Sequence, residues 1–344
     1  MSRIVVGLSG GVDSAVAAWL LKKEGHEVIG CRMRTFDTEA SFIEEESAKR
    51  VADHLGIPLI IKDYREEFRT DVIDYFASEY AAGRTPNPCL ICNRQVKWKS
   101  LMSCMNEAGA SFVATGHYAS AGHEGRWYVR RADSPKDQSY ALFNLTQEEI
   151  SHTIFPLTKY TKDEIRQIAS EAGLSNAEKP DSMEICFIPE NDYAGFLREK
   201  FGIEDCPGNY IDADGNILGR HEGIVHYTVG QRKGLGIALG KRIFVKEIRP
   251  LTNEVVLADD EDVFTERIML RDVNFQLAAE DAGEVKAQSV KVRYSDRGTP
   301  GIMIRDDNGD FLVRFEKPVR AAAPGQAAVL YDDKNRILCG GFIK

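Results

Sequence analysis

The amino-acid sequence predicts an α/β domain with a parallel sheet at its N-terminal end, followed by a small central module and a C-terminal β-rich domain. Three observations predict this order. Strand-like and helical patterns alternate over the first part of the chain, short β-like runs separated by turn signals fill the last part, and 344 residues are too many for one ordinary core.

The first domain is expected to contain strands at short apolar runs, namely residues 4–8, 27–33, 58–61 and 112–118. Helical spacing occurs between these runs, at residues 14–24, 42–55 and 68–82. Strands that alternate with helices form a parallel sheet whose two faces are covered by helices. We therefore expect residues 1–205 to form one α/β domain.

The pattern changes after Cys206-Pro207-Gly208. Turn signals then separate strand-length runs, which include residues 289–294, 301–304, 311–315 and 327–331. Several short strands at close spacing indicate a small β-barrel or a sandwich. We expect residues 206–262 to form a small central domain and residues 263–344 to form the β-rich domain.

The composition is that of a soluble protein, with 43% apolar and 28% charged residues. No run approaches the roughly 20 apolar residues that a membrane span needs. The N-terminus enters a strand-like run without the features of a signal peptide, and seven cysteines, an odd number, do not suit a secreted disulfide framework. We expect a cytoplasmic protein without a membrane partner.

The net charge of −9 argues by itself against a nucleic-acid partner. The charge is uneven, however, because residues 83–100 contain four basic residues and no acidic one. Charges act over a short range in physiological salt, so an acidic protein can still bind RNA through a local patch. Charge therefore permits RNA binding without requiring it.

A glycine-rich loop, Ser9-Gly10-Gly11-Val12-Asp13-Ser14, lies between the first expected strand and the first expected helix. Such a turn points backbone N–H groups, at the positive end of the helix dipole, into one crevice where glycines let phosphate approach. Asp13 would repel a bare phosphate, so we expect it to hold Mg²⁺ bridging a pyrophosphate. The loop lacks the lysine of a Walker A motif and the pattern of a dinucleotide site. A plain glycine turn is the alternative interpretation.

Two cysteines, Cys89 and Cys92, follow a segment whose prolines hold the backbone extended. The cations Arg94, Lys97 and Lys99 come next, and they would lower a thiol pKa. Cys186 lies far away in the sequence. Three interpretations are open on these residues: cysteines without a function, a structural zinc site that lacks an obvious fourth ligand, and sulfur chemistry by a persulfide or a three-cysteine iron–sulfur cluster.

The loop hexapeptide is the signature of the PP-loop ATP pyrophosphatases, so the chain resembles enzymes that adenylate a carbonyl oxygen, release pyrophosphate and let a nucleophile displace AMP. Over nearly its full length the chain is also similar to the bacterial tRNA-specific 2-thiouridylases. The matching segments occur in the expected order, at residues 7–14, 85–97, 114–118, 136–138, 181–188, 229–237 and 293–294.

This resemblance implies a PP-loop domain, a small central domain and a C-terminal β-barrel that contacts tRNA. It implies ATP-dependent thiolation of carbon 2 of the wobble uridine in tRNAs for Lys, Glu and Gln, with sulfur from a donor protein or inorganic sulfide, and a disulfide bond. The implied ATP-binding residues are Gly7, Leu8, Ser9, Gly10, Gly11, Val12, Asp13, Ser14, Met33 and Gly116. Cys186 would carry a persulfide and Cys92 would be a second catalytic cysteine, acting as nucleophile.

The resemblance also implies two sets of RNA-contacting residues. Asn87, Pro88 and Cys89 would lie beside the target base. The residues expected to contact tRNA are His117, Lys136, Asp137, Gln138, Arg293, Tyr294 and Gln326. Taken alone, each has an ordinary structural explanation, such as an exposed strand pair at residues 293–294.

The chain departs from the family at Cys89, where well-known members have an aspartate. A thiol, with a reference pKa near 8.5, is a poorer general acid at neutral pH. Cys89 instead completes a three-cysteine set with Cys92 and Cys186, of the kind that related tRNA thiolases use to hold a 4Fe-4S cluster. The persulfide and cluster routes are both open. Alternative functions are a PP-loop ligase that uses ammonia or an amine, and a tRNA-binding protein without chemistry.

Overall fold

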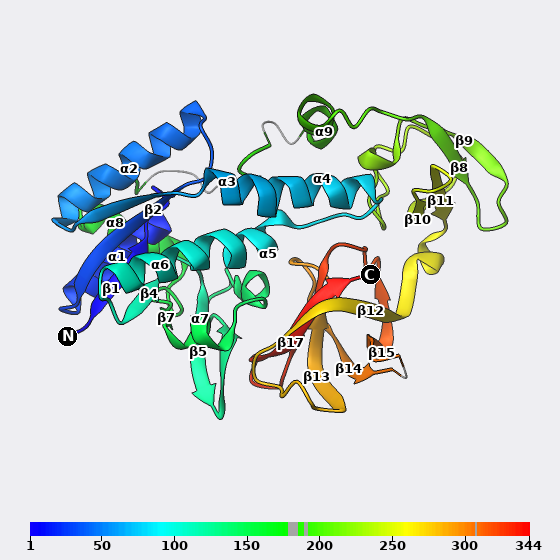
Figure 1. Ribbon diagram of the computed structural model, residues 1–344. Helices are drawn as coiled ribbons and strands as arrows, with labels where there is room; N and C mark the ends of the chain where they lie inside the picture. The colour runs from blue at the N-terminus through cyan, green and yellow to red at the C-terminus, as the bar shows by residue number, and fades with distance from the viewer. Residues whose placement is uncertain (178–184, 189–191, 307) are drawn as a thin grey trace.

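The computed structural model describes residues 1–177, 185–188, 192–306 and 308–344. Along the chain it consists of a parallel sheet surrounded by helices, a small four-stranded sheet and a closed β-barrel (Figure 1). The predicted fold class is therefore confirmed, and the alternative of a C-terminal sandwich is wrong. The exact bounds expected for the three domains stay predictions.

The N-terminal sheet has the strand order β3-β2-β1-β4-β7, and neighbouring strands are parallel. Its strands are β1 (Arg3–Gly7), β2 (Glu27–Arg34), β3 (Leu59–Asp63), β4 (Phe112–Ala114) and β7 (Thr153–Ile154). β1 lies in the middle, so successive strands are added first on one side of it and later on the other. Open parallel sheets bind ligands at the carboxyl ends of their strands at such a switch point. The loop after β1 lies there.

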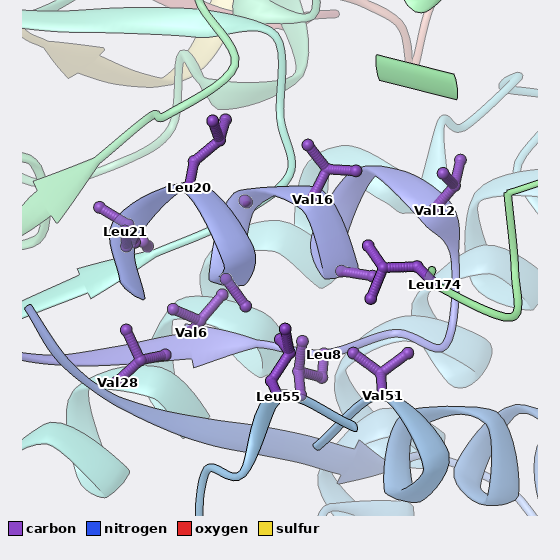
Figure 2. Close-up of a cluster of buried hydrophobic side chains, with 14 of the residues drawn as sticks. Val6, Leu8, Val12, Val16, Leu20, Leu21, Val28, Val51, Leu55 and Leu174 are labelled. Atoms are coloured by element: carbon purple, nitrogen blue, oxygen red, sulfur yellow. The ribbon is translucent and has the colours of Figure 1, made fainter. Parts of the chain in front are cut away.

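Helix α1 (Val12–Lys23) has apolar residues around most of its surface. Such a helix is buried on more than one side by its neighbours. Figure 2 shows Val16 and Leu20 of α1 in a cluster with Val6 of β1 and with Leu8, which directly follows β1. Helices α2 (Glu39–Leu55) and α8 (Lys162–Glu171) also contribute to this cluster. Fully burying each such side chain contributes about 1.5 to 3 kcal/mol. This packing fixes the start of α1 against the sheet.

Two long helical segments follow the sheet strands. The first runs through α3 (Arg65–Phe68), the π-helical η1 (Arg69–Ile73) and α4 (Asp74–Ala81); the second runs through α5 (Pro88–Cys92), the π-helical η2 (Asn93–Trp98) and α6 (Lys99–Glu107). The expected helix at residues 68–82 is thus confirmed, but it begins earlier, at Arg65. No helix in the described part of the chain is long and apolar enough to cross a membrane.

The strand expected at residues 112–118 is too long, because β4 ends at Ala114. Thr115 Oγ1 lies 2.9 Å from His117 Nδ1, and Gly116 packs against the start of α1, so the backbone turns away from the sheet. The chain then forms the hairpin β5 (Ala119–Glu124) and β6 (Arg126–Arg131). Short helical elements follow, namely η3 (Ser139–Leu142), α7 (Gln147–Ser151), α8 and α9 (Tyr193–Phe201).

The central sheet has the order β10-β11-β8-β9. Its strands are β8 (Gly208–Ile211), β9 (Ile217–His221), β10 (Phe244–Arg249) and β11 (Glu254–Ala258), with the 3₁₀ turns η5 (Ile224–His226) and η6 (Asp260–Val263). Tyr210, Val245 and Leu257 are buried in its core. η6 leads from this sheet into the barrel (Figure 1).

The barrel closes in the order β12-β15-β14-β13-β16-β17. Its strands are β12 (Phe264–Phe275), β13 (Glu284–Lys291), β14 (Thr299–Arg305), β15 (Phe311–Arg320), β16 (Ala327–Tyr331) and β17 (Ile337–Ile343). The prediction of a strand at residues 289–294 is wrong for its last three residues, because β13 ends at Lys291. There Asp296 Oδ2 accepts from Val292 N at 3.1 Å, and Asp296 N donates to Arg293 O at 3.1 Å. These bonds form a turn, so Arg293 and Tyr294 are not an exposed strand pair.

The barrel packs directly on the N-terminal domain. Val329 and Phe342 of the barrel share one buried cluster with Leu90 of α5 and Trp98 of η2. Tyr140 OH reinforces the contact by donating to Ala327 O at 2.9 Å. The barrel is therefore held beside the helix that bears Cys89 and Cys92.

Candidate functional site

The loop between β1 and α1 is shaped by its own serines. Ser14 Oγ donates to Gly11 O at 3.0 Å and lies 3.2 Å from Ser9 Oγ. The carbonyl of Gly10 accepts from Ser47 Oγ at 3.0 Å, which holds it against α2. Gly11 begins α1 without a side-chain cap, so backbone N–H groups at the start of this 12-residue helix can bind an anion.

Two glycines allow close backbone contacts at this loop. Gly10 has φ of +79°, and a Cβ there would lie 2.5 Å from Glu44 O. A Cβ on Gly116 would lie 2.7 Å from Ser14 N. Gly116 therefore lets the chain after β4 lie against the start of α1.

The structure brings the sequence-predicted ATP residues to one edge of the sheet. Residues 7–14 end β1 and begin α1, Met33 lies near the carboxyl end of β2, and Gly116 follows β4. β2 and β4 flank β1 on its two sides. That these residues bind ATP stays a prediction, which this placement supports.

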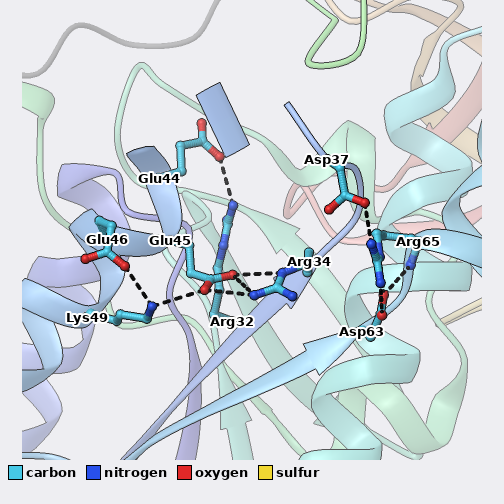
Figure 3. Close-up of polar contacts among 9 residues, drawn as sticks. All are labelled: Arg32, Arg34, Asp37, Glu44, Glu45, Glu46, Lys49, Asp63 and Arg65. Atoms are coloured by element: carbon cyan, nitrogen blue, oxygen red, sulfur yellow. Dashed lines mark hydrogen bonds and ion pairs between the residues drawn. The ribbon is translucent and has the colours of Figure 1, made fainter. Parts of the chain in front are cut away.

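Arg32 connects the phosphate loop to α2. Its Nη1 donates to Ser9 O at 3.3 Å and its Nη2 pairs with Glu44 Oε2 at 3.1 Å, as Figure 3 shows for the second contact. The side chain is 9% exposed, and its buried Nε has no hydrogen-bond partner among the described residues. An orphaned buried donor beside the loop suits an acceptor on a bound ligand.

Asp13 lies among cations. Lys162 Nζ and Tyr118 OH both donate to Asp13 Oδ1 at 2.7 Å, and Lys136 Nζ lies 3.9 Å from Asp13 Oδ2. Lys162 is the first residue of α8, where Thr161 and Glu164 form a reciprocal capping box. The capped helix end thus directs an ammonium group to the phosphate loop.

The described residues near Asp13 fit a Mg²⁺ ion only as a single-carboxylate site. No group of three or more His, Cys, Asp or Glu side chains suited to a metal occurs within residues 1–177, 185–188, 192–306 and 308–344. Mg²⁺ commonly binds one or two carboxylates together with substrate phosphates and water. Asp13 suits that mode, and the cations beside it suit the phosphates.

The first two cysteines lie at the two ends of α5. Asn87 Oδ1 caps this helix by accepting from Cys89 N at 3.2 Å, and Pro88 occupies its first position. Cys89 is exposed, whereas Cys92 is 9% exposed and packs in a cluster with Phe68 and other apolar side chains. The amide oxygen of Asn87 therefore caps the helix that carries both cysteines.

Cys186 joins these cysteines from a distant part of the sequence. Its neighbour Phe187 packs edge-to-face on Phe68, with ring centroids 5.7 Å apart, and on Phe76 at 5.4 Å. Phe187 also packs against the buried cluster that contains Cys92, so Cys186 lies in the same region as α5. The charges of Cys92 and Cys89 raise the pKa of the Cys186 thiol. Residues 181–184 of the same predicted segment lie outside the described residues.

Cys92 is buried, and Cys186 keeps exposed surface as a residue, but loss of solvent around the sulfur outweighs the nearby cations in setting the pKa of both thiols. Burial raises the pKa of the Cys92 thiol to about 11 and that of Cys186 to about 12. Lys97 lowers both pKa values, but by less than burial raises them. The lowered thiol pKa expected next to the cations that follow Cys92 is therefore wrong for Cys92. All seven cysteines are free, so the implied disulfide stays a prediction, and the three thiols do not form a metal-binding group among the described residues.

His117 lies against the rings and cation of η2. Its ring centroid is 5.6 Å from that of Trp98, and Lys97 adds a like charge nearby. Burial, with a smaller effect of Lys97, lowers the pKa of His117 to about 3. The imidazole is therefore neutral at physiological pH, and a tRNA contact through it would be a hydrogen bond or a stacking contact rather than an ion pair.

The segment Lys136-Asp137-Gln138 lies next to the phosphate loop. Gln138 N donates to Tyr118 O at 2.8 Å, and Gln138 Oε1 accepts from Tyr118 N at 3.0 Å. Asp137 shapes its own turn by accepting from Ser139 N at 3.0 Å. Tyr294 OH donates to Asp137 O at 3.0 Å. The structure thus brings the predicted RNA residues 136–138 and Tyr294 together.

Gln326 lies at another place, beside the segment that leads to Cys89. Its Nε2 donates to Thr85 O at 2.8 Å. Thr85 N donates in turn to Pro324 O at 2.8 Å. Arg293 is half-buried, and its buried Nε has no partner among the described residues. The tRNA contacts of these residues stay predictions.

Sequence reasoning missed Lys162, Tyr118 and Arg32 as site residues. Lys162 has only a helix-start signal, Thr161 followed by Glu164, which does not indicate a ligand. Arg32 is a charged residue inside an apolar strand run, which is the one available signal, because buried charges need partners.

Three family models match the chain. The tRNA methyl transferase HUP domain matches residues 2–190, the tRNA methyl transferase PRC-barrel domain matches residues 194–259, and the aminomethyltransferase beta-barrel domain matches residues 265–343.

Curated relatives match over nearly the full length. The tRNA-specific 2-thiouridylase MnmA of Lachnoclostridium phytofermentans is 47% identical over 355 residues, which cover 99% of this chain and 99% of that protein. The tRNA-specific 2-thiouridylase MnmA of Clostridium perfringens is 44% identical, with coverage of 99% and 98%. Among solved structures, the U34-tRNA thiolase NcsA from Methanococcus maripaludis with its 4Fe-4S cluster is 19% identical with a TM-score of 0.37, and the match covers 54% of this chain and 60% of that one.

Proposed function

The chain belongs to the tRNA-specific 2-thiouridylase family, and from this premise we propose that it converts a uridine of tRNA into 2-thiouridine in an ATP-dependent reaction. The position of Glu44 carries the proposal. Glu44 pairs with Arg32, which donates to Ser9 O in the phosphate loop, and the charge of Glu44 also acts on the Cys186 thiol. These contacts support a single site that the phosphate loop and Cys186 share.

Adenylation is the first step. The O2 atom of the target uracil attacks the α-phosphate of ATP, an O–P bond forms, and pyrophosphate leaves with the electrons of the broken P–O bond. The N–H groups at the start of α1 and the ammonium groups of Lys162 and Lys136 are placed to stabilise the charge on the leaving group. Asp13 would hold a Mg²⁺ ion, which would neutralise the phosphates further.

Sulfur transfer is the second step. A persulfide on Cys186 attacks carbon 2 of the adenylated base, a C–S bond forms, the C2–O bond breaks, and AMP leaves with the electron pair of that bond. The Cys92 thiolate then attacks Sγ of Cys186, the persulfide S–S bond breaks, and its electron pair stays on the thiolated base. Cys92 and Cys186 end as a disulfide, which an external thiol reduces. The effect of the Cys92 charge on the Cys186 pKa supports this pairing.

Lys97 has a role in the second step. Burial raises the pKa values of Cys92 and Cys186, whereas the positive charge of Lys97 lowers both. A thiolate is the nucleophile in thiol chemistry. Lys97 is therefore the described cation that favours the reactive form of both sulfurs.

A 4Fe-4S cluster on Cys89, Cys92 and Cys186 is the second candidate for the sulfur carrier, and the exposed thiol of Cys89 favours it. The three thiols do not form a metal-binding group among the described residues. An iron count on anaerobically purified protein separates the candidates. About four iron atoms per chain with a broad visible absorbance band would support the cluster, and a colourless protein would support the persulfide.

The substrates proposed from the family are tRNAs for Lys, Glu and Gln. A desulfurase, which delivers sulfane sulfur, is the sulfur source for the persulfide, and inorganic sulfide is the source for the cluster candidate. The test is nucleoside analysis of an unmodified tRNA transcript after incubation with ATP, Mg²⁺ and the sulfur source. The Cys186→Ser variant is expected to form no 2-thiouridine, and Cys206→Ser, which removes another exposed thiol, is the matched control. Pyrophosphate release that needs ammonia but not tRNA would instead support a ligase.

A further inference from the structure

Residues 230–243, here called the basic loop, take no part in the proposed adenylation or sulfur-transfer steps. The loop joins η5 to β10 and contains Arg232, Lys233, Lys241 and Arg242, with no acidic residue. Lys241 pairs with Asp259 at 2.7 Å. Arg232, Lys233 and Arg242 are exposed, and no carboxylate pairs with them in the part of the chain that the structure describes. This one segment therefore carries three solvent-exposed positive charges.

These cations line a pocket between the central sheet and the barrel. The pocket has a volume of about 690 Å³, and its charged lining residues are Arg232, Lys233, Arg242, Arg320 and Asp260. Four basic side chains therefore face one carboxylate. Because walls of low dielectric focus the field of like charges, such a pocket attracts anions more strongly than the same charges on an open surface.

The barrel side of the pocket is held in place. Arg320, at the end of β15, pairs with Asp260 Oδ1 at 2.7 Å, and its guanidinium lies 4.5 Å from the centre of the Phe244 ring. Asp260 therefore has a partner, which leaves the charges of the loop cations unbalanced. A fixed arginine suits phosphate recognition because its donors need no reordering.

The pocket connects directly to the segment that leads to Cys89. Thr228, just before the basic loop, lies with its Oγ1 3.1 Å from Thr85 Oγ1. Gln231 N donates to Thr228 O at 2.9 Å, and Gln231 Oε1 accepts from Thr228 N at 2.9 Å. Gly230 lies against Ala321 of the barrel, where a larger residue would clash. The basic loop is therefore fixed between the barrel and the Thr85 segment.

We propose that this pocket binds phosphodiester groups of the RNA backbone, and that it holds the tRNA while the target base lies at the cysteines. The inference rests on the proposed function, because the RNA partner comes from it. A polyanion with regularly spaced phosphates suits a pocket that offers several cations at once and is too open to enclose one small anion. Phosphate contacts of this kind position a nucleic acid without reading its sequence.

The test compares Arg232→Ala/Arg242→Ala with Lys286→Ala/Lys317→Ala, which also removes two exposed positive charges but outside the pocket. Binding of unmodified tRNA transcript is measured by fluorescence anisotropy at several salt concentrations. The pocket variant is expected to bind about ten-fold more weakly, and its slope of log affinity against log salt is expected to be smaller by about two units. The surface variant is expected to match the wild type. Thermal unfolding checks that both variants fold.

Different results would overturn the RNA-binding role of the pocket and the proposed 2-thiouridylase function. Wild-type protein that thiolates tRNA, with a pocket variant that binds and thiolates equally well, would overturn the pocket but leave the function intact. Wild-type protein that forms no 2-thiouridine would overturn the function, while a reduced salt slope in the variant would still support RNA binding here. A variant that loses binding of inorganic pyrophosphate but not of tRNA would identify a small-anion site and overturn the inference.

Discussion

The ammonium group of Lys162 lies 2.7 Å from Oδ1 of Asp13, although 149 positions separate the two residues. Asp13 belongs to the first turn of α1, and Lys162 is the first residue of α8. The packing of α8 on α1 therefore brings a cation to the phosphate loop. In the proposed reaction this cation faces the pyrophosphate that leaves ATP.

Replacing Lys162 by Met is expected to lower the rate of tRNA-dependent pyrophosphate release by about 100-fold, because one preorganised donor to developing charge is worth that much. Lys162→Arg keeps the charge and is expected to retain more activity. The matched control is Lys159→Met, an exposed lysine close by. Equal rates for Lys162→Met and wild type would contradict the role of Lys162.

Replacing Gly116 by Ala is expected to weaken ATP binding strongly, because the new Cβ would lie 2.7 Å from Ser14 N and displace the start of α1. Calorimetric titration of ATP measures the effect. Gly283→Ala is the control, since no atom lies within 4 Å of a Cβ there. Equal ATP affinities for Gly116→Ala and Gly283→Ala would contradict a role for Gly116 in the ATP site.

His117 is expected to lower the free energy of unfolding as the pH becomes acidic. Burial lowers its pKa to about 3, whereas the unfolded chain takes up a proton near the reference pKa of about 6.5. The unfolded state therefore binds the proton first as pH falls, and native stability is lost over that window. Between about pH 7 and about pH 5.5 this residue accounts for about 1 kcal/mol. Urea unfolding should show that His117→Asn has a pH dependence weaker by that amount, and an unchanged dependence would refute a neutral His117.

Cys186 is expected to react slowly with iodoacetamide in the free protein. Because burial raises its pKa to about 12, the thiolate fraction grows about ten-fold per pH unit throughout the neutral and mildly alkaline range. Site-resolved mass spectrometry should therefore show an alkylation rate that still rises at about pH 9. A plateau below that pH would mean that the thiol is already ionised.

Much of the fold could be predicted because its signals are local. Alternating apolar runs and helical spacing indicate the parallel sheet, and turn residues separate the barrel strands. The errors occur where a distant contact decides the end of a strand. β4 stops at Ala114 because Gly116 packs on α1, and β13 stops at Lys291 because Asp296 forms a turn with Val292 and Arg293.

The same distinction holds for the candidate site. The phosphate loop is contiguous in sequence, so its residues could be identified directly. Lys162 could not, because its position depends on how α8 packs. The pKa shift of Cys92 was expected in the wrong direction, since nearby cations are visible in the sequence while the apolar cluster around Phe68 forms only in the fold.

In the proposed function, adenylation at the phosphate loop and sulfur transfer from Cys186 are steps of one reaction on tRNA. A single-turnover experiment that counts AMP and 2-thiouridine in the same quenched samples tests it most directly. We expect one AMP per 2-thiouridine for the wild type, no AMP when tRNA is omitted, and no 2-thiouridine for Cys186→Ser. Thiolation by Cys186→Ser at the wild-type rate would contradict it.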